Sequence, residues 1–135
     1  MKNAKSPLIG GQFIQEWDRK WVKVPGGLKH HHRHLRDSVG LYRLRLNGRD
    51  VALGTGTDKK GGLAKRLSDF RRPSPSGRNY HTGRLIYDHL DQLDVEVLIT
   101  GGRHEPEIAR QLKTPMIRRH RPAWTAPNAP FMRKG

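Results

Sequence analysis

The sequence predicts an α+β domain, because segments with strand-like and helix-like spacing of apolar residues follow one another along the chain. Residues 39–54 and 94–100 alternate between apolar and polar side chains, which is the pattern of half-buried strands. Residues 63–70, 83–93 and 106–116 instead carry apolar side chains three or four positions apart, the spacing of one helical face. We therefore expect an antiparallel sheet covered by helices.

The first two strands are expected to form a hairpin that turns at Asn47-Gly48. Tyr42 and Leu44 point to one side of this segment, and Arg43 points to the other. Asn-Gly between two alternating runs is the strongest short-range hairpin signal. The sequence thus places Tyr42 on the apolar side of a strand next to a tight turn.

A helix is expected directly after the hairpin. A glycine-rich connector at residues 54–62 leads into a segment with apolar side chains at helical spacing from Leu63 to Phe70. Arg66 lies at the margin of this apolar stripe. A hairpin tyrosine and a helix arginine, Tyr42 and Arg66, can therefore converge on one phosphate.

The last predicted helix begins at Pro106, a residue that suits the first turn of a helix. Gly101-Gly102 ends the preceding strand. Pro115 lies inside the helical pattern, where it removes a backbone donor and clashes with the preceding turn. We therefore expect a kink or a break at Pro115.

Residues 1–38 are expected to form a basic arm, followed by a domain at residues 39–128 and a tail at residues 129–135. Glycine and proline punctuate the arm, and it ends in a histidine-rich tract. We interpret the tract as a strip along nucleic-acid phosphates that gains charge when its histidines are protonated. The alternatives are a solvated loop, a transition-metal site, because imidazole suits Zn, Cu or Ni, and a tether to a protein partner. The residues of the strip are Lys29, His30, His31, His32 and Arg33.

A second irregular segment is expected at residues 71–79, where two Ser-Pro steps and a glycine disfavour regular structure. We interpret it as a loop that grips the nucleic-acid backbone, and the alternative is a spacer between two helices. His81 follows this loop and is a candidate for lining the site, whereas His89 is expected at the edge of the core. The candidate contacts in the loop are Arg71, Arg72 and Arg78.

The charge composition independently predicts a polyanionic partner. Lys and Arg number 27 against 12 acidic residues, the net charge is +15 and the pI is near 11.1, above the value of about 9 typical of nucleic-acid-binding domains. A merely soluble basic surface and adhesion to anionic lipid are the alternatives, and no basic amphipathic helix or lipidation signal supports the latter. Arginine is favoured for bidentate phosphate contact. In the C-terminal part, the candidates are Arg118, Arg119 and Arg121.

Two absences narrow the function classes further. The sequence has no cysteine, which excludes disulfides, thiolate metal sites and a cysteine nucleophile. No stretch approaches the roughly 20 apolar residues needed to cross a bilayer, and the N-terminus lacks the apolar run of a secretory signal. We therefore expect a cytoplasmic protein, of bacterial or phage origin.

Four ordered blocks resemble the signature of the GIY-YIG nuclease family. The blocks are Gly40-Leu41-Tyr42, Ala52-Leu53-Gly54, the helix that carries Arg66, and residues 117–125, which are similar to the closing stretch in nucleotide excision repair nucleases. The resemblance implies a three-stranded antiparallel sheet flanked by helices, a bound divalent metal, and DNA cleavage without a covalent intermediate. In that chemistry Tyr42 would activate or position the attacking water, and Arg66 would neutralise charge on the phosphate.

The sequence also departs from the signature. Lys113 occupies the position of the family's metal-binding glutamate, and Ala52 replaces the second tyrosine. The closing asparagine falls on Thr125, with Asn128 as a stand-in. Divalent cations such as Mg²⁺ prefer oxygen ligands, and an ammonium would repel them.

The sequence therefore predicts a protein that binds nucleic acid, with DNA as the expected partner, through a nuclease fold that has weak or no activity and no metal site. The first alternative is an active Mg²⁺-dependent endonuclease whose metal is held by another oxygen ligand. The second is a basic structural subunit of a nucleoprotein assembly.

Overall fold

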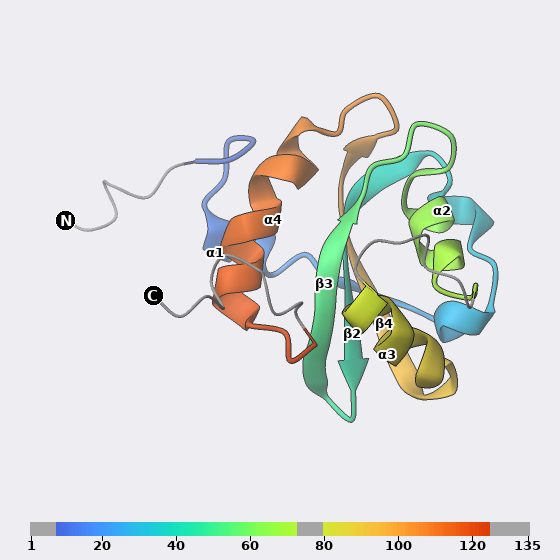
Figure 1. The fold of residues 1–135 in the computed structure, drawn as a ribbon. Coiled ribbons are helices and arrows are strands. Elements are labelled where there is room, and N and C mark those ends of the chain that lie inside the picture. Colours follow the sequence, from blue (N-terminus) through green and yellow to red (C-terminus); the bar gives the residue numbers. More distant parts are fainter. Residues whose placement is uncertain (1–7, 73–79, 125–135) are drawn as a thin grey trace.

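The computed structural model describes residues 8–72 and 80–124. Its centre is an antiparallel sheet in the strand order β1-β4-β2-β3 (Figure 1). The strands are β1 Val22–Val24, β2 Ser38–Leu46, β3 Arg49–Gly56 and β4 Leu93–Gly102. The helices are α1 Ile14–Trp17, α2 Gly62–Asp69, α3 Tyr80–Asp88 and α4 Glu107–His120, and 3₁₀ turns cover Gly27–Lys29, Arg33–Leu35 and Leu90–Gln92. Within the described ranges, no helix has the length and apolar character needed to cross a membrane.

The predicted hairpin is confirmed as β2 and β3. Tyr42 pairs with Gly54, and the connecting residues Asn47 and Gly48 have φ values of 53° and 81°. Two positive φ values in a two-residue turn match the right-handed twist of the flanking strands, which explains the Asn-Gly preference. The predicted third strand is confirmed as β4, whose Val97 pairs with Tyr42 on the other side.

The sheet has four strands rather than the three that the resemblance implies. The additional strand, β1, pairs its Val22 and Val24 with Val97 and Val95 of β4. Three residues are too few to display an alternating pattern, so the sequence did not predict this strand. The strand forms because β4 offers a free edge for pairing. Residues of the expected 1–38 arm thus complete the sheet of the domain.

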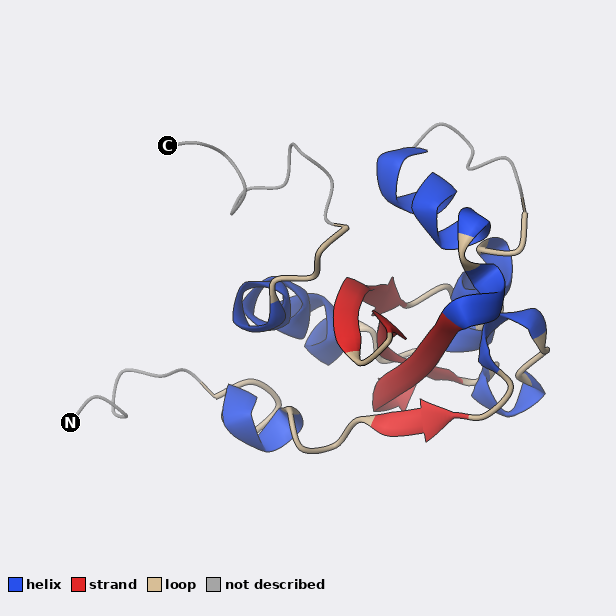
Figure 2. Cartoon of the chain, turned by 90° about the horizontal axis from the view of Figure 1, so that it is seen from below, coloured by secondary structure: helices blue, strands red, loops and turns tan. Residues whose placement is uncertain are grey.

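Helices cover both faces of the sheet (Figures 1 and 2). On one face α2 and α3 supply Leu63, Leu67 and Ile86 to an apolar cluster that also contains Tyr42. On the other face α1 and α4 form a second cluster, built around Leu41, Leu53, Leu98, Ala109, Leu112 and Met116. The alternation of β2 therefore sends Tyr42 and Leu41 into different cores.

The described part of residues 1–38 is packed into the domain instead of extending from it as an arm. Trp17, Leu28 and Leu35 are buried, and Trp17 Nε1 donates a hydrogen bond of 2.7 Å to the carbonyl of Ile9. These apolar side chains lie too far apart in sequence to show a period, so the pattern of the segment did not predict their burial. Residues 1–7 lie outside the described residues.

Two helices differ from their predicted extents. The segment expected to be one helix at residues 83–93 is α3 followed by a 3₁₀ turn, and Leu93 already belongs to β4. The expected break at Pro115 does not occur, since α4 continues through it to His120. Leu112 and Met116 are fully buried on either side of the proline, and this packing maintains the helix despite the missing donor.

A polar cluster connects the N-terminal segment to the last turn of α4. The carboxylate of Asp18 accepts a hydrogen bond of 2.8 Å from Trp21 Nε1. It also accepts hydrogen bonds of 2.7 Å from Arg119 Nε and from His120 Nε2. Burial raises the pKa of Asp18, but the hydrogen bonds from Arg119, His120 and Trp21 outweigh burial and hold the pKa below its usual value.

Acidification is expected to remove the stability that Asp18 contributes. Because the pKa of Asp18 is lowered by folding, its contribution is complete above the unfolded-state pKa and is lost as the pH falls through the folded-state pKa. Asp18→Asn should therefore lower the free energy of unfolding near pH 7 by about 1.5–3 kcal/mol. Thermal unfolding from pH 7 to pH 3 should show this difference shrinking.

The matched control is Asp88→Asn, because Asp88 is an exposed carboxylate at the end of α3. This variant should unfold like the parent across the same pH range. A difference between Asp18→Asn and the parent that stays constant down to pH 3 would contradict the role assigned to Asp18.

Candidate functional site

Tyr42 lies on the face of β2 that α2 covers. Its side chain is only 5% exposed, and its ring contacts Phe70 edge-on with 5.3 Å between ring centroids. The hydroxyl group extends over the neighbouring strand, where a Cβ added to Gly54 would lie 2.5 Å from the hydroxyl oxygen. Gly54 therefore provides the space that the Tyr42 hydroxyl occupies.

Gly40 permits close contact between β2 and β4. A Cβ at this position would lie 2.0 Å from the carbonyl oxygen of Leu98 and 3.0 Å from the Cα of Ile99. The register between β2 and β4 shifts next to Gly40, so the two backbones approach closely at this point. The glycines of both signature tripeptides thus have steric roles around Tyr42.

Arg66 extends from α2 toward the same aromatic pair. Its guanidinium carbon lies 6.0 Å from the ring centroid of Tyr42 and 5.3 Å from that of Phe70. The Nε atom of Arg66 is buried and has no hydrogen-bond partner among the described residues. The structure therefore brings Tyr42 and Arg66 together on one face of the sheet, with a cationic group that has a donor left to satisfy.

Phe70 was recognised in the sequence only as a member of the apolar stripe of α2. It follows Arg66 by four residues, so the two side chains meet on one side of the helix. The ring contacts both Arg66 and Tyr42 and thereby limits the positions that the guanidinium can adopt. The i, i+4 spacing was the signal that could have identified this contact.

Lys113 is exposed on α4, on the opposite side of the sheet from α2 (Figure 1). The two carboxylates nearest to it in the preceding sequence, Glu105 and Glu107, do not form a metal site. Glu105 Oε1 accepts a hydrogen bond of 2.9 Å from the backbone of Gly102, and Glu107 is exposed in the first turn of α4. Within residues 8–72 and 80–124, no group of three His, Cys, Asp or Glu side chains could hold a metal ion. The described residues therefore do not fit a divalent cation.

Ala52 is buried in the core, beside Leu44 on the same face as Tyr42. It supplies no hydroxyl to the site. In the closing stretch, Trp124 packs against this core, and its backbone N–H donates to the carbonyl of Val51 at 2.8 Å. Thr125 and Asn128 lie outside the described residues.

The histidine-rich tract is fixed by internal contacts. His32 is 7% exposed, and its Nε2 donates a hydrogen bond of 2.7 Å to the carbonyl of Gly27. Arg71 donates to the carbonyls of Leu28 and His30 at 3.1 and 3.2 Å, and to His31 Nδ1 at 3.2 Å. The tract thus packs onto the end of α2 through Arg71.

Several other predicted contact residues form ion pairs within the domain. Lys29 pairs with Asp91 at 2.8 Å, and Arg72 lies 3.8 Å from Asp69. Arg119 is bound to Asp18, as described above. Three further candidates are exposed and form no ion pair within the described residues, namely Arg33, Arg118 and Arg121. Arg78 and the side chain of His81 lie outside the described residues.

His89 lies at the edge of the core, as expected from the sequence. It is partly buried, its Nδ1 donates a hydrogen bond of 2.8 Å to the carbonyl of Leu85, and its ring lies 4.9 Å from that of Trp124. These contacts are sufficient to explain its position.

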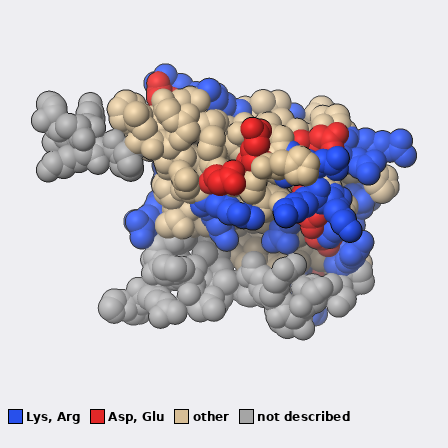
Figure 3. Space-filling view, turned by 90° about the horizontal axis from the view of Figure 1, so that it is seen from above, with Lys and Arg blue, Asp and Glu red and all other residues tan. Residues whose placement is uncertain are grey.

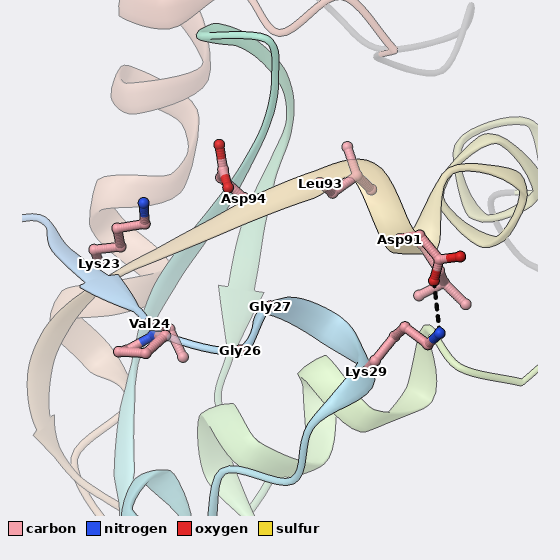
Figure 4. Close-up of a pocket in the computed structure, with 10 residues that line it drawn as sticks. Lys23, Val24, Gly26, Gly27, Lys29, Asp91, Leu93 and Asp94 are labelled. Atoms are coloured by element: carbon pink, nitrogen blue, oxygen red, sulfur yellow. Dashed lines mark ion pairs between the residues drawn. The ribbon is translucent and has the colours of Figure 1, made fainter.

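An open pocket of about 440 Å³ lies between β1, the start of β4 and the Gly27–Lys29 turn (Figure 4). The Lys29–Asp91 ion pair lies along its wall, and Lys23 and Asp94 add one further charge of each sign. Neither Tyr42 nor Arg66 lines it. Its balanced charges favour no particular ligand.

The hairpin, the arginine-bearing helix and the third strand together form the fold of GIY-YIG endonuclease domains, and this chain has that fold. It is similar to the crystal structure of the GIY-YIG N-terminal endonuclease domain of UvrC from Thermotoga maritima bound to magnesium. The TM-score is 0.52 at 17% identity, over 73% of this chain and 96% of that one. A point mutant of the same domain gives a TM-score of 0.51 at 17% identity, over 73% and 94% of the two chains. No protein-family model and no curated protein matches the sequence.

Proposed function

We propose that this protein binds nucleic acid, with DNA as its partner, through a GIY-YIG fold that no longer cleaves efficiently. The observation that carries the proposal is the environment of Arg66. Its guanidinium group is held against two aromatic rings, and its Nε is buried without a hydrogen-bond partner among the described residues. Leaving a buried donor of a charged group unsatisfied is costly. Arg66 as a whole is only partly buried, and a phosphate held against the remainder of its guanidinium group would complement the charge.

The overall charge of +15 supports the same class of partner. The similar UvrC domain is described as an endonuclease with a catalytic divalent cation. In this chain the position of the metal-ligand glutamate belongs to Lys113, and the described residues offer no alternative donor set. The proposed role of Arg66 is therefore to bind phosphate, with Tyr42 and Phe70 orienting its guanidinium group.

An active endonuclease is the second candidate function, and the retained pairing of Tyr42 with Arg66 favours it. A basic structural subunit of a nucleoprotein assembly remains the third. In each case the protein would act where nucleic acid is accessible, and we propose the cytoplasm of a bacterial or phage-infected cell.

The proposal predicts salt-dependent binding to which Arg66 contributes. Fluorescence anisotropy with labelled duplex DNA, single-stranded DNA and RNA should show affinity that falls steeply with salt concentration. Each neutralised phosphate contributes about −0.9 to the log–log slope on duplex DNA. Arg66→Ala should weaken binding and flatten the duplex slope by about that amount.

The matched control is Arg84→Ala, which removes one exposed arginine from α3. It should change the slope less than Arg66→Ala does. The proposal fails if the parent shows no binding to any of the three nucleic acids at low salt. The role of Arg66 fails if both variants bind equally well.

A further inference from the structure

His120, the last residue of α4, lies between two carboxylates that come from distant parts of the chain. Its Nε2 lies 2.7 Å from Asp18 Oδ1, and its Nδ1 lies 3.2 Å from Asp50 Oδ2. Asp18 directly follows α1, and Asp50 belongs to the edge strand β3. The imidazole ring therefore connects the N-terminal segment, the edge of the sheet and the last turn of α4 (Figure 1).

This group is largely shielded from water. The side chains of Asp18, Asp50 and His120 are 14%, 12% and 16% exposed. On the surface, by contrast, Figure 3 shows Lys and Arg with Asp and Glu among them, where solvent weakens each pair. A charge that loses its partner in a shielded group is much more costly. The protonation state of His120 should therefore affect how firmly these segments are held.

The cation nearest to Asp18 lies on the side of the carboxylate away from the ring. Arg119 Nε donates to Asp18 Oδ2 at 2.7 Å, whereas His120 contacts Oδ1. Trp21 Nε1 also donates to Oδ1, at 2.8 Å, and its ring lies edge-on to the imidazole with 6.4 Å between centroids. The charged group that faces His120 from the N-terminal segment is thus the carboxylate of Asp18.

Asp50 is arranged in the same way. Arg45 Nε, from β2, lies 2.9 Å from Asp50 Oδ1, but neither atom forms a hydrogen bond among the described residues, so the two are not aligned. Arg45 also lies 3.7 Å from Glu96 of β4, which in turn pairs with Arg43 at 2.6 Å. The remaining oxygen, Asp50 Oδ2, faces His120. The ring therefore meets a carboxylate at each of its nitrogens, and both arginines lie beyond them.

Only a protonated imidazole suits both contacts. A neutral ring has one N–H donor and one lone pair, whereas the imidazolium has two donors. With a neutral ring, a lone pair would face a carboxylate oxygen inside a shielded group. The other histidines packed into the domain differ, because His32 and His89 contact backbone carbonyls and form no ion pair within the described residues. The position at the end of α4 also favours a positive charge, because of the helix dipole.

We infer that His120 is a pH-responsive switch, whose protonated ring holds the last turn of α4 to both Asp18 and Asp50 and whose deprotonation releases Asp50. The contact with Asp18 is the shorter one and has hydrogen-bond geometry, whereas the contact with Asp50 is an ion pair without it. A neutral ring should therefore keep its proton on Nε2 and its bond to Asp18. The lone pair on Nδ1 then repels the carboxylate of Asp50.

The segment that follows α4 is attached at the same place on β3. The backbone N–H of Ala123 donates to the carbonyl of Asp50 at 3.0 Å, and that of Trp124 donates to the carbonyl of Val51 at 2.8 Å. Asp50 thus holds the end of α4 through its side chain and the next residues through its backbone. Release of its side chain should loosen this segment from the edge of the sheet. The inference does not depend on nucleic-acid binding.

NMR of the unaltered protein tests the switch without any substitution. The ring ¹⁵N shifts of His120 should show two protonated nitrogens at pH 6 and a neutral Nε2–H form at pH 9. Hydrogen-exchange protection factors of the Ala123 and Trp124 amides should fall as the ring loses its proton. Amides of α2, on the other face of the sheet, should keep their protection. Unchanged protection of Ala123 and Trp124 while the ring titrates would overturn the inference.

A variant pair measures the coupling between the ring and Asp50. Because folding places the protonated ring beside a carboxylate, the stabilisation is present at lower pH and is lost as the pH rises. Asp50→Asn should therefore move the midpoint of the His120 titration to lower pH, by about one unit or more. Asp88→Asn, which alters an exposed carboxylate on α3, should leave that midpoint in place. Equal midpoints in the two variants would show that Asp50 does not hold the protonated ring.

Discussion

Gly40→Ala is expected to destabilise the protein by about 3 kcal/mol or more, at or above the upper end of the usual range for overpacking. The added Cβ would lie 2.0 Å from the carbonyl oxygen of Leu98 and 2.9 Å from its carbonyl carbon. Both atoms belong to the backbone of β4, so no side-chain rotation can relieve the overlap. The strands would have to separate beside Tyr42.

Urea unfolding measures this effect as a shift of the midpoint. The control is Gly102→Ala in the same sheet, because a Cβ there would meet its nearest atoms, Glu105 Oε1 and the Asp37 carbonyl oxygen, at 3.6 and 3.8 Å. Gly102→Ala should change stability by no more than about 0.5 kcal/mol. Equal midpoints for the two variants would show that β2 and β4 can separate at Gly40 without loss of stability.

The core of the fold was predictable because its elements carry local patterns. The Asn47-Gly48 turn fixes the register of β2 and β3 through its positive φ values. The spacing of Leu63 and Leu67 identified α2 and placed Arg66 at the edge of its buried face. These features depend on residues close together in sequence, and their geometry follows from strand and helix periods alone.

The N-terminal segment was not predictable in the same way. β1 has three residues and exists only because β4 has an edge to pair with. Leu28 and Leu35 are buried by contacts with distant parts of the chain, and no local period marks them. For the same reason a deletion of residues 1–36 would remove part of the sheet and core, and it would not isolate a binding arm.

In the candidate site too, features set by local spacing could be predicted and contacts between residues far apart in the sequence could not. The convergence of Tyr42 and Arg66 could be predicted, because hairpin and helix spacing orient both side chains. The contacts that Arg71 and Arg119 make inside the domain could not be predicted, since their partners lie 40–43 and 101 residues away in the sequence. The net charge includes these arginines as if they were free to bind a ligand. In the structure they instead hold segments of the domain together.

No Mg²⁺-dependent cleavage is expected from the unaltered protein. A divalent cation needs oxygen ligands at this kind of site, and the resemblance aligns the signature glutamate with Lys113, an exposed cation. Incubation with plasmid, single-stranded DNA and RNA in the presence of Mg²⁺ or Mn²⁺ should give the same background as Arg66→Ala. Binding measured in parallel separates a protein that binds without cutting from one that does not bind.

Lys113→Glu is the variant most able to change this result. It places a carboxylate at the position that the resemblance aligns with the signature glutamate, so it should raise the affinity for Mg²⁺, measured by calorimetry. Cleavage requires more than this ligand, because α4 and the Arg66 helix pack on opposite faces of the sheet and Ala52 leaves one hydroxyl absent. Catalytic groups tolerate displacement of only about 0.5 Å. Lys113→Gln is the control, since it removes the same positive charge and adds no carboxylate.

If Lys113→Glu produces cleavage, adding Arg66→Ala should reduce it by about 10²–10³-fold, the usual effect of removing one group that stabilises transition-state charge. That outcome would show that the Tyr42 and Arg66 pair still addresses a reactive phosphate. Robust cutting by the unaltered chain that disappears with Arg66→Ala would contradict the proposed loss of activity. Another carboxylate would then have to hold the metal. Glu105 and Glu107 would be the first to replace, because Glu107 lies in the first turn of α4 and Glu105 lies two residues before that helix.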